Sequence, residues 1–426
     1  MSKLAKIIGA VAVINIVARL FGFLREIVIG NQYGTTSVAD AITTAYTIPN
    51  FIYLVVGGAL TTAFISVYHS TTEKERFVRN AFGTILLTAV SVTVLLMIFT
   101  DPLLHLLFEE LEPNEYVLVR TLFLWMMPSA IVLVLSTWMS GLLNVNGRFS
   151  LSSVAVLLYN VAFLGIAVLL TKFYGPESYG IGAFFGALIM GVFLYIGLKK
   201  SKLYSLKPAI KMSHDVKRLW VIALPILFGG ASLQFYFIIH RIAASLLDEG
   251  VISSVNYASK LSGFPQAIMM TAVTTVIYPL LSKKEGEGDI ETIRILYKKG
   301  LRYLGVLLVP ATVVAYLLSE PLIRLVFERG NFDENSVIMT VPIFRAFTLS
   351  MFFLAANTYI TRFYYAKGNS IIPVIFSLIS VFGINLAVIF LLIDSVGAPA
   401  IAYGTVISAA VNFLMLGAYA KWKWKL

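Results

Sequence analysis

Residues 7–29 read IIGAVAVINIVARLFGFLREIVI, an apolar run that carries Arg19, Arg25 and Glu26. A helix crosses the hydrocarbon core of a bilayer with about 20 apolar residues, so this run is long enough to span. Lysines precede the run, as in a signal peptide, but no small-residue cleavage site follows it. The run therefore predicts an uncleaved first membrane helix that holds three charges.

The composition extends this prediction to the whole chain. Of 426 residues, 58% are hydrophobic and 13% are charged, with a mean hydropathy of +0.85, whereas soluble proteins contain about 25% charged residues. No segment alternates apolar and polar residues as membrane-barrel strands do, so the spans are predicted to be helices. The fold class is an all-α polytopic membrane protein with about 12 transmembrane helices. The candidate spans begin near Ile7, Val38, Phe82, Tyr116, Ser152, Tyr179, Leu219, Val251, Leu301, Ile338, Ile371 and Ala400.

The residues that the chain lacks exclude several kinds of chemistry. Without cysteine there are no disulfides, thiolate metal sites or cysteine nucleophiles. The four histidines show no ligand spacing and there is no P-loop motif, so we expect no metal, no other cofactor and no ATPase. A membrane glycosyltransferase or ligase would need a substantial outer loop with catalytic groups. The predicted outer loops are short, so an enzyme is not expected.

The basic residues are distributed asymmetrically between alternate loops. Of 33 lysines and arginines, 24 fall in the N-terminus, one set of loops and the C-terminal tail, and only Lys172, Arg324 and Arg329 fall in the opposite loops. Because basic loops stay in the cytoplasm, both termini are predicted to be cytoplasmic. The asymmetry also explains the net charge of +11, so no nucleic-acid partner is predicted.

Two short stretches of the chain resemble each other. Residues 101–109 read DPLLHLLFE and residues 320–328 read EPLIRLVFE. Both stretches are amphipathic and too short to span, so we expect them to lie in the outer membrane interface.

Polar residues elsewhere recur in the same register. The intervals between Arg25, Asp40 and Pro49 are repeated by Arg241, Asn256 and Pro265, and an offset of 225 residues relates Arg120 to Arg345 and Asn160 to Asn385. Chance similarity among apolar helices does not readily explain polar residues in register at several places. The chain is therefore predicted to contain two copies of one unit.

The repeat predicts the domain organisation. An N-terminal six-helix lobe covers residues 1–200, a cytoplasmic basic linker covers 201–218, and a C-terminal six-helix lobe covers 219–426. Because each copy has an even number of spans, both enter the membrane from the same side. A pseudo-twofold axis along the membrane normal is therefore predicted.

Charged residues inside the spans are the main functional signal. If all of them faced lipid, they would cost about 20 to 28 kcal/mol, so they are expected to face a polar interior. Six bases against two acids leave four surplus positive charges, and an anionic ligand is the natural complement. The set is Arg19, Arg25, Glu26, Asp40, Arg120, Arg241, Lys260 and Arg345. The candidates for substrate contact that are hardest to explain structurally are Arg19, Arg25, Arg241 and Lys260.

Other members of this set have structural explanations that stay open. Arg120 lies near the predicted outer interface and could reach water by snorkelling. Glu26 could be a local partner that holds Arg25, and Arg345 could cap a neighbouring helix end. Asp40, Glu26 and Arg345 also remain candidates for substrate binding.

Several motifs resemble a known family. The N-terminal segments 18–26 (ARLFGFLRE), 39–41 (ADA), 48–50 (IPN) and 63–64 (AF) look like the opening signature of the MurJ/MviN lipid II flippases. These proteins belong to the multidrug/oligosaccharidyl-lipid/polysaccharide exporter superfamily. The likeness covers about residues 5–420 and continues in GLLN (141–144), RF (148–149), YASKL (257–261), FP (264–265) and PLLS (279–282).

The resemblance implies a flippase of the bacterial plasma membrane. Such proteins carry an undecaprenyl-pyrophosphate-linked glycan precursor outward by alternating access between two six-helix lobes. The implied partners are this lipid-linked oligosaccharide, membrane lipids and, as a candidate, the cell-wall synthesis machinery. Essential arginines of the family match Arg19 and Arg25, Asp40 matches directly, Glu26 stands where aspartate is usual, and Lys260 stands at a basic position.

The chain departs from the family pattern at three places. The family often has two arginines directly after Pro-Asn, whereas residues 51–54 read FIYL here. Family members typically have fourteen helices, and twelve are predicted for this chain. Sodium coupling in some members uses carboxylates in the second lobe, but spans seven, eleven and twelve carry none well inside, with Asp394 at an edge.

A cation-coupled drug exporter of the related multidrug-extrusion (MATE) type is the alternative function. Such an exporter would favour a cavity dominated by carboxylates. Within the predicted spans of this chain bases outnumber acids three to one, which favours an anionic cargo.

Overall fold

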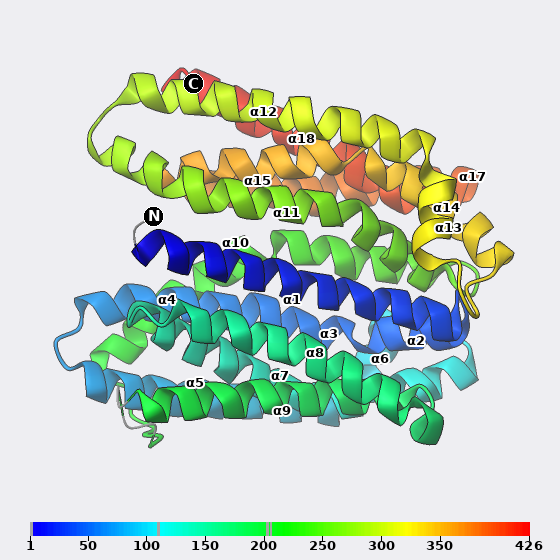
Figure 1. Cartoon of the computed structure of the whole chain (residues 1–426), viewed down its shortest axis with the longest axis horizontal. Coiled ribbons are helices and arrows are strands. Elements are labelled where there is room, and N and C mark those ends of the chain that lie inside the picture. The colour runs from blue at the N-terminus through cyan, green and yellow to red at the C-terminus, as the bar shows by residue number, and fades with distance from the viewer. Residues whose placement is uncertain (1–2, 109–110, 202–203, 205–206) are drawn as a thin grey trace. The chain divides into compact units, whose positions relative to one another are not determined.

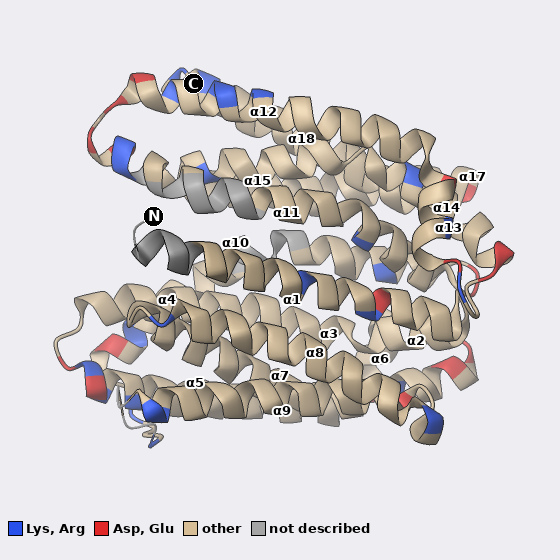
Figure 2. Cartoon of the chain, in the orientation of Figure 1, with Lys and Arg blue, Asp and Glu red and all other residues tan. Residues whose placement is uncertain are grey.

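The computed structural model of the chain describes residues 3–108, 111–201, 204 and 207–426. Within these ranges, side chains are described except at 3–8, 228–233, 271–276, 278, 279 and 282. The regular secondary structure of these ranges is entirely helical. Most Lys, Arg, Asp and Glu residues lie at helix ends or in loops, and few lie along the middle of the helices (Figure 2).

The first half of the chain forms long helices that end at local signals. Pro113 begins α7, where its missing N–H is no loss, and Gly175 ends α8 with a φ of +54°. The elements of this half, labelled in Figure 1, are α1 (Lys3–Tyr33), α2 (Ser37–Ala45), α3 (Thr47–Phe51), the π-helix η1 (Ile52–Gly57), α4 (Gly58–Ser70), α5 (Lys74–Ile98), α6 (Thr100–Leu107), α7 (Pro113–Val145), α8 (Phe149–Tyr174) and α9 (Glu177–Lys200).

The second half begins several of its helices with side-chain caps. The carboxylate of Asp289 accepts the Thr292 N–H at 3.0 Å at the start of α12, and that of Asp333 accepts the Ser336 N–H at 2.9 Å at the start of α14. The elements are α10 (His214–Ala244), α11 (Val251–Gly286), α12 (Ile290–Leu317), α13 (Ser319–Phe327), α14 (Glu334–Thr348), α15 (Met351–Ala366), α16 (Ile371–Leu378), the π-helix η2 (Ile379–Asn385), α17 (Leu386–Val396) and α18 (Pro399–Trp424).

Each of the twelve predicted spans coincides with one helix or with consecutive helices. Among the described residues, 8 helical segments are long and apolar enough to cross a membrane, or 9 if α14 and α15, which meet at 42°, form one span. The other three predicted spans are α1, α10 and α11, with 31, 31 and 36 residues, which carry most of the charges of interest. The short α6 and α13 are the helices that the repeated stretches predict.

Two spans contain a π-helix that the sequence does not predict. The span Ser37–Ser70 is built from α2, α3, η1 and α4, and the span Ile371–Val396 from α16, η2 and α17. A π-helical turn inserts an extra residue and is often found at functional positions. A Cβ atom on Gly57 of η1 would lie 3.2 Å from Thr137 Oγ1, so η1 packs closely on α7.

The chain divides into two compact units. The N-terminal unit comprises Met1–Arg25 and Ala41–Gln234, and the C-terminal unit comprises Glu26–Asp40 and Phe235–Leu426. The end of α1 and the start of α2 therefore pack with helices of the second half of the chain. The lobe boundaries 1–200 and 219–426 come from the sequence repeat and stay a prediction.

Each unit has its own apolar core. In the N-terminal unit α8 and α7 both pack on α9 (Figure 1), and Phe64 stacks on Phe77 with ring centroids 5.3 Å apart. In the C-terminal unit Tyr359 and Phe363 lie among the buried residues of α12, α15 and α18. Burial of these rings removes large apolar surfaces from water and fixes the helices that carry the polar residues.

The described part of the predicted linker packs on the N-terminal unit. The Ala209 N–H donates to the Arg79 carbonyl at 3.2 Å, and the Arg218 guanidinium donates to Ser70 Oγ at 3.1 Å. A Cβ atom on Gly83 of α5 would lie 2.6 Å from the Ala209 carbonyl oxygen. Residues 207–218 are therefore held against the end of α4 and the first part of α5 by specific contacts.

Candidate functional site

Arg25 lies between two aromatic rings in the N-terminal unit. Its guanidinium carbon is 4.8 Å from the Tyr46 ring centroid and 4.7 Å from that of Phe163. Tyr46 stands at the junction of α2 and α3, and Phe163 lies on α8. Aromatic faces attract a cation without cancelling its charge. This environment therefore fixes the position of Arg25 and preserves its positive charge.

Arg19 lies on the same helix as Arg25, nearer the N-terminus. The six-residue separation corresponds to about 9 Å along the axis of α1. The Arg19 side chain is exposed, and that of Arg25 is half-buried. The N-terminal unit thus presents two cations along one helix.

Glu26 and Arg241 are joined through an asparagine in the C-terminal unit. Asn256 Nδ2 donates to Glu26 Oε2 at 2.7 Å, and Arg241 Nη2 donates to Asn256 Oδ1 at 3.5 Å. All three residues are buried, with Glu26 4% and Arg241 8% exposed. The buried base is therefore accompanied by a buried acid, which offsets part of its desolvation cost.

Asp40 caps a helix from outside that helix. One carboxylate oxygen accepts the Gly250 N–H and the other accepts the Ser253 N–H, each at 2.7 Å. These N–H groups lie at the N-terminus of α11. The first N–H groups of a helix have no hydrogen-bond acceptor within the helix, and this end carries a partial positive charge. Asp40 is 2% exposed, so its contacts in this conformation are those of a buried helix cap.

Lys260 and Arg345 also contact aromatic rings in the C-terminal unit. Lys260 Nζ is 4.8 Å from the Phe237 ring centroid, and Arg345 lies 5.6 Å from that of Tyr316. Arg345 Nε also donates to Ser319 Oγ at 3.1 Å, at the first residue of α13. Arg345 is therefore held near the junction of α12 and α13.

The predicted site residues fall into separate groups. Arg19 and Arg25 belong to the N-terminal unit, and the other predicted residues belong to the C-terminal unit. There, Asn256 brings Glu26 and Arg241 together, and Lys260 follows Asn256 by about one helical turn. Asp40 binds the start of the same helix, α11.

Arg120 of the internal charge set forms an ion pair in the N-terminal unit. Its Nε atom lies 2.6 Å from Asp101 Oδ1, and both side chains are about half exposed. The hydrogen bond from Arg120 favours the charged carboxylate, so the pKa of Asp101 is below its usual value. The contact of Arg120 at the start of α7 is with α6, the short helix that carries Asp101.

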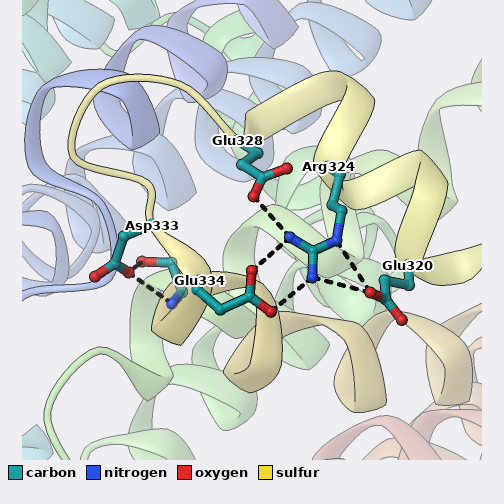
Figure 3. Close-up of polar contacts among 6 residues, drawn as sticks. Glu320, Arg324, Glu328, Asp333 and Glu334 are labelled. Atoms are coloured by element: carbon teal, nitrogen blue, oxygen red, sulfur yellow. Dashed lines mark hydrogen bonds and ion pairs between the residues drawn. The ribbon is translucent and has the colours of Figure 1, made fainter.

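The matching end of the C-terminal unit carries a larger ionic cluster. Figure 3 shows the Arg324 guanidinium surrounded by carboxylates of Glu320, Glu328 and Glu334. The nearest distances are 2.9 Å to Glu320 and 2.6 Å to each of the other two. Hydrogen bonds to Glu334 and then Glu320 raise the pKa of Arg324 above its usual value. Arg324 therefore links α13 to the start of α14.

Sequence reasoning missed several polar residues near these cations. Asn256 was visible only as the counterpart of Asp40 in the repeat, and Tyr46 gave no signal because its partners come from distant segments. In the C-terminal unit the buried ring of His240 contacts Thr405, with Nε2 to Oγ1 at 2.7 Å. Groups of three His, Cys, Asp or Glu residues suited to a metal ion are absent from the described part of the chain.

Comparison with known sequences gives one consistent family. The family model described as "Lipid II flippase MurJ" matches residues 29–426. The chain is 28% identical to a probable lipid II flippase MurJ of Rhizobium meliloti (strain 1021), over 95% of this chain and 78% of that protein. It is 26% identical to the lipid II flippase MurJ of Burkholderia cenocepacia, over 94% of this chain and 81% of that protein.

Solved structures share the fold. A structure titled "Lipid II flippase MurJ, inward closed conformation" matches with a TM-score of 0.83 and 24% identity, covering 96% of this chain and 87% of that one. An inward-facing multidrug resistance MATE family transporter of the MOP superfamily matches with a TM-score of 0.76 and 13% identity, covering 97% and 99%. The structural likeness therefore extends from flippases to drug transporters and identifies the fold only.

Proposed function

This chain belongs to the MurJ family of lipid II flippases, and from that premise we propose that it moves lipid II or a related undecaprenyl-pyrophosphate-linked glycan from the inner to the outer leaflet. The match of the family model over residues 29–426 is the observation that carries the proposal. The proposed location is the bacterial plasma membrane, with both termini in the cytoplasm, as the distribution of basic residues predicts.

The proposed ligand of the cations is the pyrophosphate group of this lipid. The residues proposed to bind it are Arg19, Arg25, Arg241 and Lys260. Guanidinium groups form charge-assisted, often bidentate hydrogen bonds with phosphate oxygens. The ring contacts of Arg25 and Lys260 support this role, because they hold each cation without neutralising it.

The other predicted residues would support the site from within the C-terminal unit. Glu26 and Asn256 would fix Arg241, and Asp40 would fix the start of α11, the helix that carries Lys260. Arg345 would act at the junction of α12 and α13, where it contacts Ser319.

The membrane potential is a sufficient driving force for the proposed transport. With a negative interior, each negative charge that leaves is favoured by about 2.3 kcal/mol per 100 mV. The family is one of transporters, so no covalent step is invoked. The lipid-linked glycan would be made on the inner side of the membrane and used on the outer side. We therefore propose the cell-wall synthesis machinery as a partner.

The fold shared with multidrug transporters does not favour a cationic drug as cargo. That likeness is at 13% identity and describes architecture. The surplus of bases within the predicted spans would repel a cation, and the family match points to an anionic lipid.

Depletion of the protein tests the proposal and identifies the glycan. We expect a lipid-linked precursor to accumulate on the cytoplasmic side, and its mass to show which glycan is carried. Expression of the wild-type chain should clear the accumulated lipid, as should the exposed control variant Lys298→Ala. Depletion without accumulation, in a strain with no second exporter, would reject the flippase and favour drug export.

A further inference from the structure

The contacts of Arg25 form part of a larger aromatic cluster in the N-terminal unit. The Tyr46 and Phe163 rings that contact Arg25 also contact each other, with centroids 5.9 Å apart in an edge-to-face arrangement. Tyr159 lies one turn before Phe163 on α8, and its ring is 5.9 Å from that of Phe163. Tyr53, from η1, adds a fourth ring 6.3 Å from Tyr159.

Packing restricts this cluster to a small range of positions. Tyr159 and Phe163 are 3% and 2% exposed, so the α8 side of the cluster is fixed in the core of the unit. Tyr53 lies in the π-helix η1, which packs against α7 at Gly57. A ring on a fixed helix is a rigid support, and an arginine held against two such rings loses little freedom when it binds a ligand.

The cluster also carries a pair of hydroxyl groups. The Tyr46 and Tyr159 oxygens are 3.2 Å apart, so one hydroxyl donates to the other. Only one proton can lie between the two oxygens, and the second proton is directed to a third acceptor. Since the Tyr46 ring also contacts Arg25, the hydroxyl pair belongs to the same cluster as the arginine.

We propose that Tyr46, Tyr159 and Phe163 are substrate-site residues of the N-terminal unit. The Tyr46 and Phe163 rings position Arg25, and the Tyr46–Tyr159 hydroxyl pair donates a hydrogen bond to a phosphate oxygen that Arg25 binds. This inference rests on the proposed function and names a subsite for the pyrophosphate. The phenol supplies a directed donor beside the guanidinium, as expected for recognition of a phosphate with several acceptor oxygens.

The hydroxyl donor is tested by binding of undecaprenyl pyrophosphate to the purified full chain. The variant Tyr46→Phe/Tyr159→Phe keeps both rings and removes both hydroxyls, whichever one donates. A hydrogen bond to a charged group corresponds to a loss of affinity of about tenfold or more. Tyr53→Phe is the matched control, because the Tyr53 ring joins the cluster while its hydroxyl is outside the pair, and its affinity should stay within about twofold of wild type.

The positioning role is tested by a double-mutant cycle between Phe163 and Arg25. Phe163→Leu should weaken binding in the wild-type background and have no further effect in the Arg25→Ala background, because the ring acts through the arginine. A ring that only stabilises the fold would weaken binding equally in both backgrounds. Thermal melting of each variant separates loss of folding from loss of binding.

The outcomes separate this inference from the proposed function. If Arg25→Ala reduces binding and the double tyrosine variant binds like wild type, the subsite is wrong and the flippase proposal stands. If wild type and Arg25→Ala bind undecaprenyl pyrophosphate equally, the anionic site itself is wrong. The subsite is supported if the double tyrosine variant loses about tenfold in affinity and if Phe163→Leu weakens binding in the wild-type background but not in the Arg25→Ala background.

Discussion

Arg25 and Arg241 occupy the same position in the two sequence repeats but have different surroundings. Arg25 lies against the rings of Tyr46 and Phe163, whereas Arg241 contacts the amide of Asn256, which in turn binds Glu26. Two aromatic rings hold Arg25, and Asn256 links Arg241 to a buried acid. Two arginines at the same position of the repeat can therefore make different contacts.

The ends of the two units that carry α6 and α13 differ in the same way. Asp101 pairs with Arg120 in the N-terminal unit, but its counterpart Glu320 pairs with Arg324, and Arg345, the counterpart of Arg120, contacts Ser319. Arg324 stands where the first stretch has His105, and it forms ion pairs with three glutamates. The repeat predicts which residues correspond, and local chemistry decides their partners.

The largest expected effect separates the two repeated arginines. Glu26→Leu removes the acid that reaches Arg241 through Asn256, and breaking a buried charged set costs about 3–5 kcal/mol of unfolding free energy. Arg25→Ala loses the contacts with the Tyr46 and Phe163 rings, worth about 0.5–2 kcal/mol. Thermal unfolding of the purified chain measures both. Equal losses in the two variants would show that the environments are energetically alike, and Glu26→Gln should fall between wild type and Glu26→Leu.

A second expected effect tests the cap at the start of α11. Asp40→Ala leaves the Gly250 and Ser253 N–H groups without their acceptor, and loss of a buried cap costs about 2 kcal/mol. The exposed Asp394→Ala is the control and should change the unfolding free energy by less than about 0.5 kcal/mol. Equal unfolding free energies of Asp40→Ala and Asp394→Ala in chemical unfolding would contradict a stabilising role of Asp40 as a helix cap.

A third, smaller effect compares this buried cap with an exposed one. Asp333 caps α14, and its hydrogen bond from the Ser336 N–H lowers its pKa. Asp333→Ala should cost about 1 kcal/mol at pH 7. The folded-state pKa of Asp333 is lowered, so the stabilisation is fully present above the ordinary pKa of aspartate, about 4. It is lost as the pH falls through the folded-state pKa.

Stability measured against pH checks the Asp333 prediction. The difference between wild type and Asp333→Ala should shrink steadily as the pH is lowered below about 4. Asp333→Asn should resemble wild type at pH 7, because asparagine also caps helices well. A difference that grows toward low pH would contradict the proposed origin of the shift.

The smallest effect compares the ionic contacts of Asp101 and Arg324. Asp101→Asn should destabilise less than Arg324→Gln, because Asp101 binds one arginine and Arg324 binds three carboxylates. Both effects should diminish in 1 M salt, where the Debye length is about 3 Å. Melting temperatures at low and high salt give the comparison. A larger decrease for Asp101→Asn would show that the number of ionic partners does not predict the loss of stability.

The sequence was sufficient to predict the helical spans. Apolar length determines a span, and the recurrence of DPLLHLLFE (101–109) as EPLIRLVFE (320–328) marks the two short helices α6 and α13. It was not sufficient for packing, because nothing in residues 26–40 shows that they belong with the C-terminal unit.

The site was predictable in its charges and less so in its partners. Arg25 and Arg241 stand out because a charge in an apolar span is costly, but the rings around Arg25 are uncharged aromatic residues, which are common in apolar spans and carry no comparable signal. Tyr46 and Phe163 are 117 residues apart in the chain, so only the fold brings them together. Likewise, Asp40 was predicted from its charge, and its role at the start of α11 required the position of Gly250.

The most direct test of the central claim is the exposure of the lipid-linked precursor at the outer leaflet of cells that depend on this chain. An impermeant enzyme that cleaves only outward-facing precursor gives the readout. The account predicts normal exposure with wild type and with Lys298→Ala, and strongly reduced exposure with Arg25→Ala and with Arg241→Ala. Normal exposure with both arginine variants, at equal protein levels, would contradict the claim that these cations carry the pyrophosphate across the membrane.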